Sequence, residues 1–320
     1  MWKAVVFAAC AAFSTCAASA DATYPTKPIR WIVPYAAGGP TELIARLMGQ
    51  RLSRDWGQQV IVDLRPGANS IIGTEIAARA QPDGYTMLMA LPALVINPHV
   101  YRKLPYSVGD FTPITNIATA PYLMLVNASL KAETPGELIA LARARPGQLN
   151  FGSGGTASPA HLAMELFMVS AGVTMTHVPY KGGAPALTDL IAGRIQVLVN
   201  PALSAAPHVR SGKLRAIAVT GAERSGIFPD LPTVAESGLP GYEVNTWYGL
   251  FAPAKTPRAI VDSVAASVRG ALEDQEVRRT IVSLDAKPLG RSSTEFAKFV
   301  RSEERKWESV AKKAGITLER

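Results

Sequence analysis

The sequence predicts an α/β protein of two lobes, each a mainly parallel sheet flanked by helices. Short β-branched runs alternate with helical periods along most of the chain, as in parallel strands joined by crossover helices. Glycine-rich loops between strands and helices recur in both halves. A chain of 320 residues also exceeds what a single hydrophobic core usually holds. Together these observations favour two lobes over one.

The first series of elements has the order βαβαβ, which predicts a parallel sheet with helices on both faces. Apolar residues recur every three or four positions in its first helix. Pro40 suits the first turn of that helix, where a missing N–H costs no hydrogen bond. Strands are expected at residues 29–33, 60–62 and 85–89, and helices at residues 40–54 and 71–80.

A second series of the same kind begins near residue 122 and predicts a second α/β lobe. Thr134 and Glu137 form a capping box for a helix that starts with Pro135. Another helix starts after Ser158, and two more end near Gly193 and Gly212. Strands are expected at residues 122–126, 149–151, 175–178, 195–199 and 214–220.

The C-terminal part contains one strand, residues 246–253, a helix after Thr256 and a final helix from Ser292 to Gly315. Because no strand series remains to form a third sheet, these helices must pack on an existing lobe, most simply the first. We therefore expect two chain crossings, near residues 124 and 246, that act as a hinge. The expected lobes are residues 21–124 with 247–320 for lobe 1, and residues 125–246, inserted, for lobe 2.

Residues 1–20 have the pattern of a secretory signal peptide, with a charged start, an apolar run and Ala18-Ser19-Ala20 at its end. The run is shorter than a membrane span requires. We expect cleavage near Ala20 and export to the periplasm. Both cysteines, Cys10 and Cys16, lie in this segment, so the mature chain has no disulfide and no thiol nucleophile. Lipidation at Cys16 is the alternative, but threonine before it fits a lipoprotein site poorly.

Composition and motifs exclude several classes of function. The net charge is +8, but basic and acidic residues alternate and no basic stripe with stacking aromatics indicates nucleic-acid binding. The four histidines show no metal-binding spacing. Ser153 lacks the G-x-S-x-G context of a nucleophile, because Phe151 stands where glycine is needed. Gly152 to Ala157 imitate a dinucleotide fingerprint, yet no acidic residue ends the following strand. We expect no catalytic residue, no metal and no cofactor.

The loop Gly38-Gly39 before Pro40 predicts an anion site. The first turn of a helix leaves N–H groups unpaired at the positive end of the helix dipole, and glycines allow close approach. We expect this N-terminus to be free. A phosphate loop would place a lysine after the glycines, but Thr41 and Glu42 follow. The ligand is therefore expected to be a carboxylate.

Two loops of the second lobe repeat this design. In residues 152–158, Ser158 caps the next helix and leaves Ser153 and Thr156 for a ligand, although the loop could also be only a tight turn. His161 follows in the first turn, with a ligand contact and a structural role both open. In residues 180–183, Lys181 is either a counter-ion or a solvated lysine, and the glycines are the better candidates. Trp247 and Tyr248 line the cleft or pack the hinge core, and the core is favoured.

In this order, the loops resemble those of the substrate-binding receptors of tripartite tricarboxylate transporters, the Bug family. The resemblance covers essentially the whole mature chain. It implies a two-lobed periplasmic binding protein of type II, a Venus flytrap, that closes on a small organic acid and delivers it to membrane permease subunits. The residues that carry the resemblance are 24–29, 33–39, 65–68, 82–86, 178–183, 212–216 and 249–253.

The resemblance also implies a ligand site. Three departures from the family pattern concern it: Glu42 in place of aspartate, Ile71 in place of asparagine, and Asn200 in place of an acidic residue. They favour a plain, partly apolar acid over an amino acid. The implied ligand-binding residues are Tyr35, Ala37, Gly38, Gly39, Thr41, Asn69, Ser70, Ser153, Thr156, Ala157, Ser158, His161, Tyr180, Gly182, Gly183 and Asn200.

The sequence thus predicts a monomeric solute receptor and no enzyme. An exported enzyme using the same cleft would need a nucleophile with a base or a metal cluster, neither of which is found. A sensor that binds the same ligand but signals stays open, because the sequence does not separate it from a transport receptor.

Overall fold

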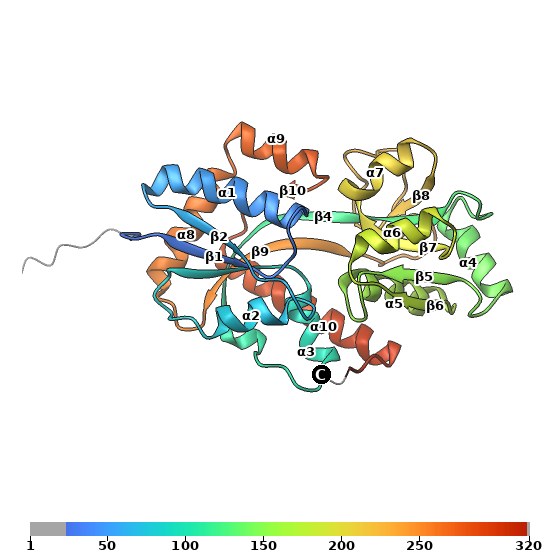
Figure 1. Ribbon diagram of the computed structural model, residues 1–320, viewed down its shortest axis with the longest axis horizontal. Helices are drawn as coiled ribbons and strands as arrows, with labels where there is room; N and C mark the ends of the chain where they lie inside the picture. The colour runs from blue at the N-terminus through green and yellow to red at the C-terminus, as the bar shows by residue number, and fades with distance from the viewer. Residues whose placement is uncertain (1–23, 319–320) are drawn as a thin grey trace, which may run out of the picture.

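The computed structural model describes residues 24–318 of the chain. The predicted signal peptide and both cysteines lie outside the described residues. Two lobes lie side by side, and β4 and β9 run between them (Figure 1). Their strands join in one ten-stranded mixed sheet of order β2-β1-β3-β9-β4-β7-β5-β6, with β8 and β10 also paired to β4. The α/β fold predicted from the sequence is confirmed.

The first half of the sheet has the predicted βαβαβ order. β1 pairs in parallel with β2 on one side and with β3 on the other. Pro40 starts α1, and Gly57 ends it in a left-handed conformation. The elements are β1 (Ile29–Val33), α1 (Pro40–Trp56), β2 (Val60–Leu64), α2 (Ile71–Ala78) and β3 (Thr86–Ala90).

The second half repeats the arrangement. β5 pairs in parallel with β6 and β7. Thr134 and Ser158 cap their helices as predicted. The elements are α4 (Pro135–Ala144), β5 (Asn150–Ser153), α5 (Pro159–Ala171), β6 (Thr176–Pro179), α6 (Gly183–Ile191), β7 (Val197–Pro201), α7 (Ala202–Arg210) and β8 (Leu214–Val219).

Two long strands connect the halves: β4 (Phe111–Asn127) and β9 (Asn245–Pro253). β4 pairs with β9 as far as Pro121, and from Tyr122 onward it pairs with β7 and β8. Every antiparallel pair of the sheet involves β4 or β9, which is why the sheet is mixed although each half has parallel strands. The exchange of partners at Pro121 lies close to the predicted crossings.

Several elements were not predicted. The first half of β4 was not predicted because Pro113 and Pro121 interrupt its apolar pattern. α3 was not predicted because it contains Pro98. α9 is short and strongly charged, so its sequence pattern alone does not predict a helix, and its formation depends on tertiary contacts. The additional elements are α3 (Ala93–Val100), the short 3-10 helix η1 (Val108–Asp110), α9 (Gln275–Ser283) and β10 (Lys287–Pro288).

The two long C-terminal helices pack on the first lobe, as expected, and one of them also contacts the second lobe. α8 (Arg258–Ala271) contacts α1 and β4. α10 (Ser293–Ala314) contacts α3 and β4 and also reaches α5 of the second lobe. Trp247 and Tyr248 are buried, so these aromatics pack the core at the crossing.

A buried carboxylate connects α10 to the crossing strand β9. Glu303 Oε2 accepts hydrogen bonds from Nε1 of Trp247 and Nε1 of Trp307, both at 3.2 Å. Lys306 pairs with the same carboxylate, so its charge is compensated. Both indoles are fully buried and their N–H groups depend on this single acceptor.

Replacing Glu303 by leucine should lower the free energy of unfolding by about 2–5 kcal/mol, because two buried indole N–H groups lose their acceptor. Urea unfolding followed by tryptophan fluorescence measures this. Glu308→Leu, at an exposed position of the same helix, is the matched control and should change stability by less than about 0.5 kcal/mol. Equal effects of the two substitutions would contradict the structural role of Glu303.

Candidate functional site

The entrance of α1 differs from the expectation of a free N-terminus, which is wrong at Gly38. The Gly38 N–H donates to Glu42 Oε2 at 2.8 Å, and Arg46 Nε donates to Glu42 Oε1 at 2.7 Å. These two bonds hold the pKa of Glu42 below its usual value. A glutamate in the first turn commonly folds back to the amides before the helix. The chain's own carboxylate therefore takes part of the predicted anion site.

The entrance of α2 has a different character. Ala68, Asn69 and Ser70 all adopt left-handed backbone angles, with φ of 48°, 51° and 71°. Such angles cost Ala68 and Ser70 about 1–2 kcal/mol each, whereas asparagine tolerates them better. The Ser70 side chain is 4 % exposed, and within the described residues its Oγ has no hydrogen-bond partner. Strain and an unpaired hydroxyl thus coincide at a helix N-terminus, as they do at functional sites.

The Tyr35 side chain lies beside Ser70. Its hydroxyl accepts a hydrogen bond from Leu91 N at 3.0 Å. Burial raises the pKa of Tyr35, and Ser70 lies close enough to influence that pKa although the two hydroxyls do not meet hydrogen-bond geometry. The phenol is therefore neutral, and its hydrogen is free to turn toward a third group.

Asn69 links this region to the second lobe. Its Nδ2 donates to Asn97 Oδ1 at 2.8 Å and, across the lobes, to Ala157 O at 3.4 Å. Asn97 Nδ2 donates back to Asn69 O at 2.9 Å, so the loop is fixed from α3. Sequence reasoning missed Asn97. The signal available was a polar amide that directly follows the apolar residues 93–96.

The second-lobe loops predicted as one site do lie together. Tyr180 N donates to Ser153 O at 3.1 Å, and Gly182 N donates to Gly154 O at 3.2 Å. Gly183, the first residue of α6, packs against Asn200, because a Cβ added there would lie 2.8 Å from Asn200 Oδ1. Residues 152–158, residues 180–183 and Asn200 therefore share one region of the lobe.

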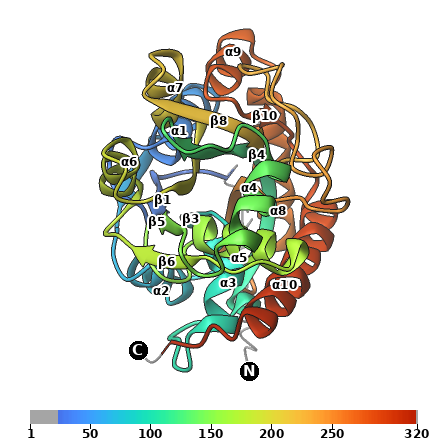
Figure 2. The same ribbon diagram turned by 90° about the vertical axis from the view of Figure 1, so that its right-hand side faces the viewer.

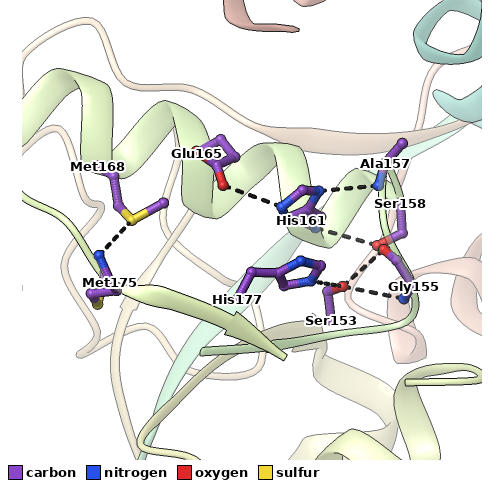
Figure 3. A network of polar contacts seen from close by, with 9 residues as sticks. All are labelled: Ser153, Gly155, Ala157, Ser158, His161, Glu165, Met168, Met175 and His177. Atoms are coloured by element: carbon purple, nitrogen blue, oxygen red, sulfur yellow. Dashed lines mark hydrogen bonds and ion pairs between the residues drawn. The ribbon is translucent and has the colours of Figure 1, made fainter. Parts of the chain in front are cut away.

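Two stacked histidines, His161 and His177, form hydrogen bonds with residues of the 152–158 loop (Figure 3). Ser153 Oγ donates to Gly155 O at 2.8 Å, so His177 Nε2, 2.7 Å away, must donate to Ser153 Oγ. Ala157 N donates to His161 Nδ1 at 3.0 Å, which leaves the His161 hydrogen on Nε2, 3.2 Å from Glu165 Oε1. The two rings stack with centroids 3.7 Å apart.

This network changes the roles expected for some residues. Ser153 and His161 are buried, and their polar atoms are paired within the lobe, so they hold the loop in place. Tyr180 Oη donates to Asp189 Oδ2 at 2.8 Å, and burial with this neighbour raises the pKa of Tyr180 to about 12. The expectation that Ser153 is free for a ligand is wrong, because its hydroxyl is paired within the loop. Of the two roles left open for His161, these contacts favour the structural one, and a ligand contact of Tyr180 stays a prediction.

The other predicted residues occupy the loops and first turns at these entrances. Ser158 Oγ accepts from His161 N at 3.3 Å and caps α5. Thr41 is buried in the first turn of α1, Gly39 caps that helix, Ala37 is exposed, and Thr156 is half-buried. Their contact with a ligand stays a prediction.

Similarity to known proteins establishes the family of this chain. The sequence model of the tripartite tricarboxylate transporter family receptor matches residues 44–316. The chain belongs to this family. It is similar to BugT of Bordetella pertussis, with 34 % identity over 94 % of this chain and 93 % of that protein. It is also 38 % identical to a protein encoded between tcbD and tcbE in Pseudomonas sp. strain P51, over 93 % of this chain and 89 % of that one.

Solved structures of similar proteins have the same fold as this chain. R. palustris Rpa4515, determined with adipate, superposes with a TM-score of 0.83 at 38 % identity, covering 92 % of this chain and 99 % of that one. MatC of Rhodopseudomonas palustris, with bound malate, gives 0.77 at 31 % identity, covering 90 % and 99 %. These relatives support the transporter-receptor fold.

Residues 24–318 contain neither a candidate membrane span nor a cluster of metal ligands. No helix in this range is both long and apolar enough to cross a membrane. In the same range, histidine, cysteine, aspartate and glutamate side chains form no group of three or more that could hold a metal ion.

His177 should make stability depend on pH. Burial, and then the neighbouring His161, lower its pKa from 6.5 to about 4. The folded protein thus binds fewer protons than the unfolded chain between these values, so stability is complete above 6.5 and falls as the pH drops toward 4. The urea midpoint of the wild type should fall through this window, and that of His177→Asn should fall less. Equal slopes would contradict the shift.

Proposed function

We propose that this protein is an exported, periplasmic receptor that captures a small organic carboxylate between its two lobes and delivers it to membrane permease subunits. The observation that carries the proposal is the buried, unpaired Ser70 hydroxyl at the N-terminus of α2. A carboxylate accepts hydrogen bonds from such a hydroxyl and from first-turn N–H groups, and the helix dipole favours its charge. Tyr35, beside Ser70, adds a second hydroxyl.

The relatives support the ligand class. Rpa4515 is described with adipate and MatC with malate, and both ligands are small dicarboxylates. The similarity of this chain to both proteins covers at least nine tenths of its length. A carboxylate is therefore the first class to test for this receptor.

The residues that depart from the family pattern narrow the class further. The Glu42 carboxylate already accepts the hydrogen bond of the Gly38 N–H, which leaves less room for a ligand carboxylate at the α1 entrance. Ile71 is buried and offers no side-chain donor. Asn200, whose Nδ2 donates to Ser204 Oγ at 2.7 Å, supplies no charge for a ligand ammonium. A partly apolar acid without an amino group fits these positions better than an amino acid.

The mechanism is a shift of population between open and closed arrangements about β4 and β9. The hydrogen bond from Asn69 to Ala157 joins the lobes in the arrangement described here. A ligand that contacts both the α2 entrance and residues 152–158 would favour this arrangement by its extra contacts. The closed surface is then what the permease recognises.

An exported enzyme or a ligand sensor remains the alternative. Ser153 and His177 lie at hydrogen-bond distance, as a nucleophile and base would, but the serine hydrogen is directed to Gly155 O. The geometry therefore favours a structural pair over a nucleophile. A receptor returns the acid chemically unchanged, whereas an enzyme converts it.

A thermal-shift screen of mono-, di- and tricarboxylates and aromatic acids should identify the ligand class. At 100 times its dissociation constant, a ligand that binds only the folded state adds about 2.7 kcal/mol to stability. Sugars and amines serve as comparison compounds. Stabilisation by a sugar or an amine, with no response to any acid, would refute the proposed carboxylate.

Ser70→Ala should weaken binding of the acid found in that screen about 10- to 100-fold, because a hydrogen bond to a charged group is lost. Lys181→Ala should change the affinity little, since we expect this lysine to be solvated. Ser302→Ala, on the exposed side of α10, is the matched control for serine truncation. Calorimetric titration measures all three variants. The reverse order, with Lys181→Ala more damaging than Ser70→Ala, would show that a side-chain ion pair dominates.

A further inference from the structure

A cavity of about 570 Å³ lies at the hinge, away from the loops of the candidate site. Figure 2 shows α9 at the top, beside β10, and α10 at the lower right, whereas α1, α2 and α6 lie on the left. Elements of both lobes line the cavity. Residues 221–226 come from the second lobe, while α9, residues 285–291 and α10 come from the first. Its volume is in the range of small-molecule sites.

Contacts between the lobes hold the walls in place. Ser225 Oγ donates to Asp285 Oδ2 at 2.8 Å, and Gly226 N donates to Asp285 Oδ1 at 3.0 Å. Lys287 Nζ lies 2.8 Å from Glu223 Oε1. Ser225 and Asp285 are buried, so the cavity has a defined shape in this arrangement of the lobes.

The lining includes a buried side-chain amide that has no hydrogen-bond partner within the described residues. Asn116, on β4, is 0 % exposed, and within the described residues neither its Oδ1 nor its Nδ2 has a hydrogen-bond partner. Its backbone oxygen accepts from Gly290 N at 3.0 Å, which fixes the residue against the chain that carries Arg291. Leaving a buried amide without partners costs about 1–3 kcal/mol, so a group that bound its Oδ1 or Nδ2 would recover that free energy.

Arg291 supplies a cation to the lining of the same cavity. Its guanidinium carbon lies 4.5 Å from the centroid of the Phe299 ring. No carboxylate in residues 24–318 lies within ion-pair distance of it, although Glu295 is near enough for Arg291 to lower the pKa of that carboxyl. Other cations of the lining are paired: Lys287 with Glu223, and Lys306 with Glu303. An arginine resting on an aromatic face is pre-organised to bind an anion.

Apolar side chains complete the lining. Phe299 and Leu289 contribute apolar surface next to the arginine, and Val282 of α9 is 52 % exposed. The cavity therefore offers donors at one part of its lining and an apolar surface at another, a combination typical of ligand pockets.

We propose that this cavity is a second ligand site, for a small organic anion with an apolar body, whose charged group binds Arg291 and the Asn116 amide. The site goes beyond the proposed receptor function because it uses none of the residues at the α1, α2, α5 and α6 entrances. A molecule bound there would contact both lobes behind the crossing strands.

The probe for this site is anilinonaphthalene sulfonate, which joins an anionic group to an apolar aromatic body and fluoresces when bound. Titration of the folded protein should give saturable binding. Arg291→Gln should weaken it about tenfold or more, because the charged partner is lost. Ala222→Trp, which adds bulk to the cavity wall, should weaken it to a similar extent.

Matched substitutions at exposed positions outside the cavity lining are the controls. Arg305→Gln on α10 and Ala144→Trp on α4 should leave the dissociation constant of the probe within about twofold. Circular dichroism confirms that each variant is folded. Unchanged binding in both Arg291→Gln and Ala222→Trp would overturn the proposal.

Ser70→Ala separates this site from the one between the lobes. It should leave probe binding unchanged, and weakening equal to that of Arg291→Gln would place the probe at the α2 entrance and overturn the second site. Stabilisation by a sugar or an amine but by no acid would refute the proposed function alone, because the probe titration does not depend on that screen.

Discussion

The exchange of partners along β4 is the constraint on which the rest of the structure depends. One continuous strand is hydrogen-bonded to β9 up to Pro121 and to β7 and β8 beyond it. Both halves of the sheet therefore share a backbone, while the helices of each half bury their own apolar faces. Because β4 pairs with strands of both halves and β9 ends beside the exchange, we propose that rotation of one lobe against the other concentrates at these strands.

The same constraint places the loops of the candidate site. The parallel strands of each half direct their carboxyl ends, and the helix entrances that follow, toward one region of the molecule. Asn69 and Ala157 come into hydrogen-bond contact there although they lie far apart in the sequence. Ser70 stays buried and unpaired beside them. In contrast, Glu42 and His161 have their polar atoms paired within their own lobes.

This division explains how far the site was predictable. Helix entrances follow from local patterns such as Gly39-Pro40 and Ser158-Pro159, and the structure has them where the sequence predicts. The partner of each polar atom does not follow from local patterns. Gly38 and Glu42 are four residues apart, yet only side-chain geometry decides that they bond. Asn97 donates a hydrogen bond to Asn69 O from α3, a helix that was not predicted because it contains a proline.

By itself, the sequence determined the α/β class, the helix entrances of both lobes and the family resemblance, because periodicity and capping act over a few residues. Only the tertiary structure decided which donors are free and which are paired. The stacked pair His161 and His177, the unused amide of Asn116 and the unpaired hydroxyl of Ser70 depend on chain segments that meet across long separations. Burial sets the hydrogen-bonding needs of each group, and burial is a property of the whole fold.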